Sequence, residues 1–420
     1  MIPIIPVGAR RESPAAGALR AFNAKGGITL SALPPLSLYV HFPWCVKKCP
    51  YCDFNSHEAQ GGPGAIPEAL YLDALNRDLE AVLPLIWGRR VHSVFIGGGT
   101  PSLLSESGLD RLLADLRARV NLEADAEITL EANPGTVEAA RFASYRASGV
   151  NRLSIGVQSL NDAHLKTLGR IHDADQARRA MVIAASVFEN FNVDLMYALP
   201  HQTVSEARED LADVLAFGPQ HVSLYHLTLE PNTVFAKFPP PLPSEDTALL
   251  MQDSLLDMLA HAGFLRYEVS AFARPHRQSR HNLNYWHFGD YLGIGPGAHS
   301  KLSFANRIVR QTRPKQPQGY LERAARSEPL FDETVVSGAE LPFEFFLNTL
   351  RLTDGVPASQ FSERVGLSLS VVARELTLAR DKGLLADDPI RLRATALGMD
   401  FLSDLQAMFL PKLVRERAPS

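Results

Sequence analysis

The fold is decided by the stretch His41-Phe42-Pro43-Trp44-Cys45-Val46-Lys47-Lys48-Cys49-Pro50-Tyr51-Cys52, which follows an apolar run at 36–42 that is predicted to be a strand. All 3 cysteines of the chain lie within its last eight positions. Structural cysteines scatter through a core, and disulfides need an even number. Three thiolates on a loop after a strand favour a cubane iron–sulfur cluster that keeps one iron open. Three unconnected cysteines or an incomplete zinc site are the alternatives.

Length and charge limit the class of protein. The 420 residues are enough for two or three domains. A net charge of −4 argues against a general nucleic-acid binder, and we expect no nucleic-acid partner. No uncharged apolar run reaches the roughly 18 residues that a membrane span needs. Arg10 and Arg11 follow the apolar N-terminal residues, which is the wrong order for a secretory signal. Because an oxidising compartment would endanger the thiolates, we expect a cytoplasmic protein.

Strand-like and helix-like segments alternate between residues 38 and 230. Each strand is a nearly continuous apolar run, which predicts a parallel sheet with helices outside it. Six such units would curl into an incomplete barrel that is open on one side. The predicted fold class is therefore α/β, with a partial (β/α)6 barrel. The expected strands are 38–42, 94–98, 127–132, 152–158, 193–199 and 222–229, and the expected helices are 68–83, 108–120, 137–148, 175–188 and 204–217.

Polar residues and glycines lie at the ends of these strands. Gly97-Gly98-Gly99-Thr100 follows the second strand, Glu131 ends the third, Gln158 ends the fourth, and Asp194 lies in the fifth. Each is also explained by a tight turn, a cap or a buried hydrogen bond. In a barrel of this kind, however, these strand ends meet at one rim, where ligands bind.

The cysteine spacing C-x3-C-x2-C after a first strand resembles the radical S-adenosylmethionine (SAM) superfamily. Five further stretches resemble its oxygen-independent coproporphyrinogen III oxidase-like family. In this family SAM chelates the open iron of a 4Fe–4S cluster. The resemblance implies that Cys45, Cys49 and Cys52 hold the cluster. The matching stretches are 39–43, 95–101, 131–134, 156–159 and 192–195, and the implied SAM-binding residues are Tyr39, Tyr51, Gly98, Gly99, Thr100, Glu131, Gln158, Arg170 and Asp194.

Two subgroups of this family differ in function. The dehydrogenases carry a fourth cysteine two positions after the third, where this chain has Phe54. The chain resembles the heme-chaperone subgroup here, and again at Asn284-Tyr285-Trp286 and at 289–295. The family often has a cysteine where this chain has Ser279.

Residues 280–291 combine two histidines with several aromatic residues. A neutral imidazole can bind heme iron, and flat rings can line a porphyrin. The alternative is a loop packed on the open edge of the barrel. With the resemblance, His281 becomes the preferred heme ligand, with His287 and His299 as rivals. Asn282 could hydrogen-bond its other ring nitrogen, and Tyr285 and Trp286 could face the macrocycle.

The remaining chain is predicted to form two further segments. Pro239-Pro240-Pro241 marks a break, followed by a helix at 244–262 and a strand at 266–272. Residues 340–420 contain 10 Lys and Arg against 11 Asp and Glu, too few cations for a DNA-binding module. We therefore expect a lid or docking domain with a wing strand at 389–393. The expected segments are a disordered extension at 1–35, the partial barrel at 36–240, a family-specific extension at 241–330 and an α+β winged-helix-like domain at 331–420.

Three functions follow from these observations. The first is a heme chaperone that binds heme, a 4Fe–4S cluster and SAM, and delivers heme to acceptor proteins, including membrane-associated ones that it would meet at the membrane periphery. The second is SAM-dependent oxidative decarboxylation of coproporphyrinogen III in heme biosynthesis. The third is a radical enzyme with an unrelated substrate. Any of them would need an electron donor for the cluster. The sequence favours the first and leaves open whether SAM is cleaved.

Overall fold

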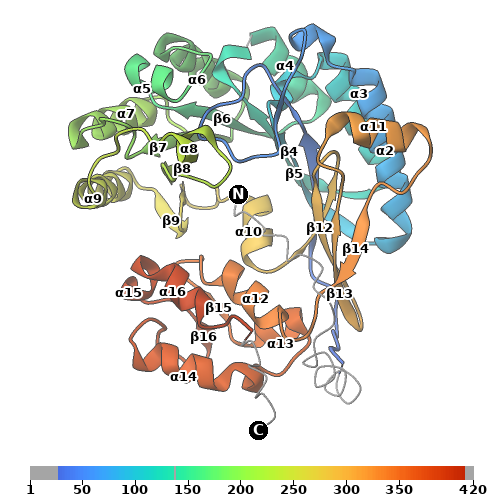
Figure 1. Ribbon diagram of the computed structural model, residues 1–420, viewed down its shortest axis with the longest axis vertical. Helices are drawn as coiled ribbons and strands as arrows, with labels where there is room; N and C mark the ends of the chain where they lie inside the picture. The colour runs from blue at the N-terminus through green and yellow to red at the C-terminus, as the bar shows by residue number, and fades with distance from the viewer. Residues whose placement is uncertain (1–26, 137–138, 412–420) are drawn as a thin grey trace.

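Six parallel strands form the centre of the fold, in the order in which they occur in the chain (Figure 1). The structure is a computed structural model, which describes residues 27–136 and 139–411. Every pairing among the six is parallel, so their carboxyl ends meet at one rim. The predicted partial (β/α)6 barrel is confirmed. The six strands are β1 (Leu36–Phe42), β4 (Arg90–Gly98), β5 (Asn121–Ala132), β6 (Arg152–Gln158), β7 (Phe191–Tyr197) and β8 (His221–His226).

Helices cover the outer face of these strands (Figure 1). Their apolar positions recur every three or four residues, which forms one buried stripe on each helix. Thr203 and Glu206 form a capping box at the start of α7, and Asp173 and Gln176 form another at the start of α6. The helices are α2 (Glu68–Val82), α3 (Glu106–Arg119), α4 (Ala139–Ser148), α5 (Asp162–Thr167), α6 (Ala174–Val187), α7 (Val204–Ala216) and α9 (Glu245–His261). The short α8 (Val234–Lys237) lies instead at the cysteine loop, where the Phe235 N–H donates to the Pro50 carbonyl at 3.0 Å. Residues 137–138 of the helix expected at 137–148 lie outside the described residues.

Further strands extend the sheet at both edges, to 12 strands in total. β11 pairs parallel to β1, and three antiparallel strands follow it, whereas β10 and β9 continue antiparallel from β8. In the described part of the chain β14 and β9 are the two end strands of the sheet and do not pair with each other, so the barrel stays open. These strands are β9 (Leu265–Glu268), β10 (Ala271–Ala273), β11 (Asp290–Ile294), β12 (His299–Phe304), β13 (Arg307–Thr312) and β14 (Asp332–Val335).

The single strand expected at 266–272 is wrong, because a turn divides it into β9 and β10. The Glu268 carboxylate accepts hydrogen bonds from the Ser270 backbone N–H at 3.1 Å and from its hydroxyl at 2.9 Å. This local pairing stabilises the turn. The helix α10 (Arg280–Trp286) lies between the barrel and the C-terminal domain (Figure 1), and α11 (Pro317–Ala325) packs on α2. The loop considered for residues 280–291 is therefore partly helical.

The C-terminal domain has its own core, in which Phe345, Phe346, Phe361 and Phe409 pack together. The expected wing strand is reduced to β16, which pairs with β15. Ion pairs Arg310–Glu344 at 2.6 Å and Arg351–Glu268 at 2.9 Å join this domain to the extended sheet. Its elements are α12 (Leu341–Thr349), β15 (Val356–Pro357), α13 (Ser359–Val365), α14 (Ala373–Asp381), β16 (Arg391–Leu392), α15 (Ala396–Asp400) and α16 (Leu402–Ala407).

Residues 27–35 of the expected N-terminal extension are part of the described structure. The extension's residues 1–26, like residues 412–420 of the C-terminal segment, lie outside the described residues. Thr29 donates a hydrogen bond to the Gly366 carbonyl at 3.1 Å, and the buried Leu30 donates to Ala305 at 2.9 Å. This part of the predicted disordered extension is therefore ordered. The segment limits at 240 and 330 stay predictions.

Candidate functional site

The three cysteines lie on one loop at the carboxyl end of β1. The loop begins at β2 (Trp44–Cys45), which pairs with β3 (His57–Glu58) where the chain returns to the barrel. Between these short strands, the Lys48 ammonium donates hydrogen bonds to the carbonyls of Phe54 and Ser56, at 3.1 Å and 3.2 Å. The backbone of the loop is thus held in place without using the thiols, which leaves them available to a ligand.

All three thiols are free and half-buried. Burial raises the pKa of the Cys45 and Cys52 thiols. Within the described residues no three His, Cys, Asp or Glu side chains gather as ligands of one metal ion. A cubane cluster does not need such convergence, because each of its cysteines binds a different iron. The soft sulfur donors therefore fit an iron–sulfur cluster better than a single hard ion.

His41 fixes this loop to the barrel, a role that the sequence analysis missed. Its Nε2 donates to the Asn55 carbonyl at 2.8 Å, and its Nδ1 accepts from the Tyr39 hydroxyl at 2.9 Å. Burial lowers the pKa of His41 to about 4, so the ring is neutral, as this pattern requires. Strand periodicity could have revealed this role, because Tyr39 and His41 point to the same face of β1.

The glycines after β4 lie against the start of the cysteine loop. Gly99 donates a hydrogen bond to the Phe42 carbonyl at 2.6 Å, and Thr100 donates to the Trp44 carbonyl at 2.7 Å. A Cβ at Gly98 would lie 2.6 Å from the His41 ring, and one at Gly99 would lie 2.4 Å from the Trp44 oxygen. These positions need glycine for close packing of two backbones, whether or not SAM also binds there.

Two carboxylates, Glu131 near the end of β5 and Asp194 in the middle of β7, form the next part of the site. Burial raises the pKa of Glu131 to about 7, and the charge of Asp194 adds to this effect. The Glu131 carboxylate accepts a 3.0 Å hydrogen bond from the Gly98 N–H. Burial also raises the pKa of Asp194, whereas the Asn192 amide, which donates at 2.7 Å, opposes this rise. The pair can accept hydrogen bonds from ligand hydroxyl or amino groups.

Arg170 connects this part of the site to the cysteines. Its Nη1 lies 3.7 Å from the Cys49 sulfur, and its Nη2 donates to the Gly156 carbonyl at 2.7 Å. Its buried Nε has no partner among the described residues, so a donor remains for a ligand. Gln158 lies beside Gly156 at a bulge of β6 with φ 71°, and Tyr51 hydrogen-bonds Arg170. The structure thus brings Arg170, Gln158 and Tyr51 together with the cysteine loop.

The preferred heme ligand, His281, lies inside the barrel. It is 2% exposed, stacks on Phe95 with ring centroids 4.9 Å apart, and meets the edge of Tyr285 at 5.0 Å. Burial lowers the pKa of His281 to about 3, so the ring is neutral. The contact expected from Asn282 is absent from the described residues. The Ser93 hydroxyl instead lies 3.3 Å from His281 Nδ1.

The other heme candidates are spread over α10 and its surroundings. One face of the Trp286 ring is covered by Arg351, whose Cζ is 4.4 Å from the ring centroid. The His287 carbonyl accepts a hydrogen bond from Gln360 at 3.0 Å. His299 begins β12 and is half-buried, and burial lowers its pKa to about 4. The Tyr285 ring centroid lies 5.0 Å from that of His281 and 6.5 Å from that of Trp286, so these three residues are neighbours.

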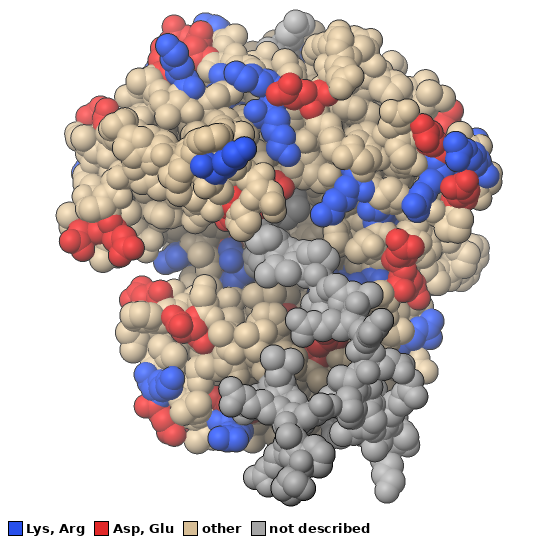
Figure 2. Space-filling view, in the orientation of Figure 1, with Lys and Arg blue, Asp and Glu red and all other residues tan. Residues whose placement is uncertain are grey.

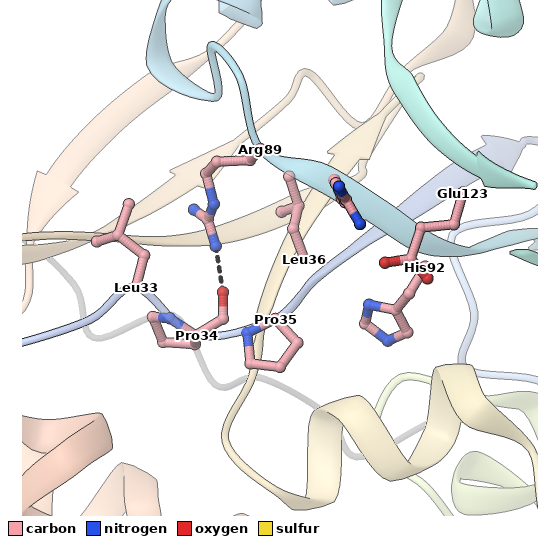
Figure 3. A pocket seen from close by; sticks show the side chains of 8 residues that line it. Leu33, Pro34, Pro35, Leu36, Arg89, His92 and Glu123 are labelled. Atoms are coloured by element: carbon pink, nitrogen blue, oxygen red, sulfur yellow. Dashed lines mark hydrogen bonds between the residues drawn. The ribbon is translucent and has the colours of Figure 1, made fainter.

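A cavity of about 330 Å³ lies at the opposite end of the barrel, at the amino ends of β1 and β4 (Figure 3). Pro34, Arg89 and Glu123 are among its lining residues, and Arg89 donates to the Pro34 carbonyl at 2.6 Å. None of the predicted SAM or heme residues lines it. The cavity is therefore separate from the candidate site.

Comparisons with known proteins identify the family and its fold. A family model described as the Radical SAM superfamily matches residues 39–214, and one described as the HemN C-terminal domain matches residues 336–401. The heme chaperone HemW of Haemophilus influenzae is 46% identical, over 90% of this chain and 98% of its own length. HemW of Escherichia coli is also 46% identical, over 90% and 99%. The solved structure of coproporphyrinogen III oxidase (HemN) from Escherichia coli, described as a radical SAM enzyme, is 26% identical with a TM-score of 0.76, over 90% of each chain.

Proposed function

We propose that this chain, which belongs to the HemW family of radical SAM proteins, is a heme chaperone that binds heme and delivers it to acceptor proteins. The observation that carries the proposal is the 46% identity to heme chaperones over nearly their whole length, against 26% to the oxidase. Phe54 supports it, since it occupies the position at which the family resemblance expects a fourth cysteine in the dehydrogenases.

The radical SAM family implies a 4Fe–4S cluster and SAM. Cys45, Cys49 and Cys52 would hold the cluster, and Arg170 would stabilise the Cys49 thiolate through its neighbouring charge. When bound, such a cluster supplies an electron to SAM. The half-buried carboxylates Glu131 and Asp194 would orient the SAM hydroxyl and amino groups through hydrogen bonds. Tyr39, Tyr51, Gly98, Gly99, Thr100 and Gln158 complete the proposed SAM site.

His281 on α10 is the preferred heme ligand. His281 is neutral, which is the form that binds iron, and no described residue hydrogen-bonds its Nε2. Because it is buried, heme could reach it only if α10 or the C-terminal domain moved. The half-buried His299 needs less movement and remains its rival. Figure 2 shows a recess between the barrel and the C-terminal domain, with Lys and Arg side chains in it, which suits the carboxylates of heme.

The proposed partners are heme-accepting proteins, some of them membrane-associated, and an electron donor for the cluster. The proposed location is the cytoplasm, with contact at the membrane periphery. No helix among the described residues has the length and apolar character needed to cross a bilayer.

The second candidate function is oxygen-independent decarboxylation of coproporphyrinogen III. The oxidase's TM-score of 0.76 over 90% of both chains favours it, together with a SAM site that retains all its predicted residues. In that case the protein would be an enzyme, and the three-cysteine loop would have to suffice for turnover.

One experiment separates the two functions. The anaerobically reconstituted protein is divided, and one part receives coproporphyrinogen III, SAM and a reductant, while the other receives heme. We expect heme to co-elute with the protein on gel filtration with a Soret band, and the tetrapyrrole carboxylates of the other part to remain intact by mass spectrometry. Multiple-turnover decarboxylation without heme retention would reject the chaperone proposal.

A further inference from the structure

A buried chain of hydrogen bonds runs beneath the proposed SAM site, from β9 to Asp194. The Tyr267 hydroxyl lies 2.8 Å from His221 Nε2, and His221 Nδ1 lies 2.6 Å from the Asn192 side-chain oxygen. The Asn192 amide nitrogen then lies 2.7 Å from Asp194 Oδ1. Tyr267, His221 and Asn192 are all at least nine-tenths buried. Three strands, β7, β8 and β9, therefore contribute to one buried chain of polar side chains.

The hydrogen bonds of this chain all run from donor to acceptor in one direction. The Asn192 oxygen can only accept, so His221 Nδ1 carries the proton, and His221 Nε2 must accept from the Tyr267 hydroxyl. Burial and the nearby Arg152 charge keep the pKa of His221 well below its ordinary value, which agrees with this neutral form. Every donor thus points toward Asp194. Hydrogen bonds aligned in this way polarise one another and stabilise the negative charge at the end of the chain.

Further hydrogen bonds fix both ends of this hydrogen-bond chain, at Asp194 and at Tyr267. The Ser154 hydroxyl donates a hydrogen bond to the Asp194 carboxylate at 3.4 Å and accepts one from the Asn192 side-chain amide at 2.8 Å. At the far end, the Tyr267 backbone carbonyl accepts a 3.2 Å hydrogen bond from Thr353 of the C-terminal domain. The first contact limits the rotation of the carboxylate, and the second holds the strand that presents the hydroxyl.

The Arg152 side chain places a positive charge near these hydrogen bonds but is not part of them. Arg152 is the largest of the fully buried side chains, and its buried Nε has no hydrogen-bond partner among the described residues. Burial raises the pKa of Asp194, and the Arg152 charge opposes this rise; the same charge adds to the burial that lowers the pKa of His221. The cation therefore acts in the same sense as the hydrogen-bond chain, favouring a charged Asp194 and a neutral His221.

We propose that Asn192, His221 and Tyr267 are positioning residues, which hold the Asp194 carboxylate charged and in one orientation for SAM. The inference rests on the proposed SAM site and adds to it residues that do not touch the ligand. Asn192 acts directly on Asp194, and His221 and Tyr267 act through Asn192. We expect their effects on SAM affinity to decrease in that order.

The test is the dissociation constant for SAM, measured by anaerobic equilibrium dialysis on the reconstituted holoprotein. Asn192→Leu and Asn192→Asp should each weaken SAM binding about tenfold, the effect of losing one hydrogen bond to a charged group. Tyr267→Phe should weaken it about threefold. Cluster content, from iron and sulfide, and the circular dichroism spectrum should be unchanged.

Two comparisons distinguish positioning from simple packing. Tyr320→Phe removes a buried hydroxyl that donates to Asp78 at 2.9 Å, outside the site, and should leave SAM affinity unchanged. His221→Gln retains a donor and an acceptor, whereas His221→Leu retains neither. Glutamine should therefore restore most of the affinity that leucine loses.

The outcomes separate this proposal from the SAM site itself. If Asp194→Asn weakens SAM binding but Asn192→Leu and Tyr267→Phe do not, the positioning chain is rejected and the SAM site stands. Equal affinities for His221→Gln and His221→Leu would also reject the chain. If the wild type binds no SAM, or Asp194→Asn is without effect, the proposed site fails, and the inference fails with it.

Discussion

Arg170 lies between the cysteine loop and the barrel rim, with Nη1 3.7 Å from the Cys49 sulfur and Nη2 2.7 Å from the Gly156 carbonyl oxygen. One side chain on the segment between α5 and α6 thus connects a proposed cluster ligand to the strand that carries Gln158. A guanidinium has five donors in a fixed plane, so it can hold both groups at once. This relationship suggests that cluster and SAM binding share a residue.

Replacing Arg170 with glutamine should weaken SAM binding about tenfold or more, because a charged donor facing the ligand is lost. The cluster should still assemble, since its three thiolates remain. Arg178→Gln is the matched control, as Arg178 is an exposed residue of α6 that pairs with Asp213. Equilibrium dialysis with SAM measures both variants, and equal affinities would show that Arg170 serves the fold only.

Replacing any one of Cys45, Cys49 and Cys52 with serine should remove most of the charge-transfer absorbance after anaerobic reconstitution. The wild type should bind about four irons and four sulfides, as a cubane cluster requires. Ser56→Ala is the control, because Ser56 lies 3.8 Å from the Cys52 sulfur but is not a proposed ligand. A full-strength cluster in all three cysteine variants would exclude the assignment.

Gly98→Ala should destabilise the protein and disturb both the cysteine loop and SAM binding. Its φ is 115°, and the new Cβ would collide with the His41 ring and the Phe42 carbonyl. Gly218→Ala is the control for the free-energy cost of placing alanine at a positive φ, because Gly218 has φ 68° and open space around it. That control should cost about 1–3 kcal/mol. Thermal unfolding midpoints compare the two, and Gly98→Ala should show the larger decrease.

Glu131 predicts a pH-dependent stability. Its pKa rises from 4.5 to about 7 in the folded protein, so between these values the folded state holds a proton that the unfolded state has lost. Stability from this group therefore falls as pH rises from about 4.5 through about 7. Glu131→Gln cannot titrate and still accepts from Gly98. The melting temperature of this variant, relative to that of the wild type, should increase between pH 5.5 and pH 8. A difference in melting temperature that does not change with pH would contradict the prediction.

His281→Ala should weaken heme binding and shift the Soret band without changing cluster content, if His281 is the axial ligand. His287→Ala and His299→Ala, titrated with heme under the same anaerobic conditions, test the two rivals. A loss confined to His299→Ala would move the heme site to the edge of β12. Overlapping curves for all three variants would leave the chaperone proposal without a histidine ligand.

The parallel barrel and the cysteine loop could both be predicted from the order of the amino acids alone. Both depend on local patterns: apolar runs of strand length separated by helical periodicity, and three cysteines within one loop. The rim residues Glu131, Gln158 and Asp194 follow from the same reasoning, because parallel strands bring their carboxyl ends to one edge.

The polar residues that serve the site indirectly could not be predicted, because long-range contacts define them. His41 and Asn55 meet across a loop, and His221 reaches Tyr267 from a strand 46 positions away. Such pairs leave no periodic signal in the sequence, because register and side-chain direction create them. Burial likewise placed His281 inside the barrel, since packing against Phe95 depends on where α10 docks. A sequence pattern records which surfaces are apolar, whereas the pairing of buried polar groups is settled only when those surfaces meet.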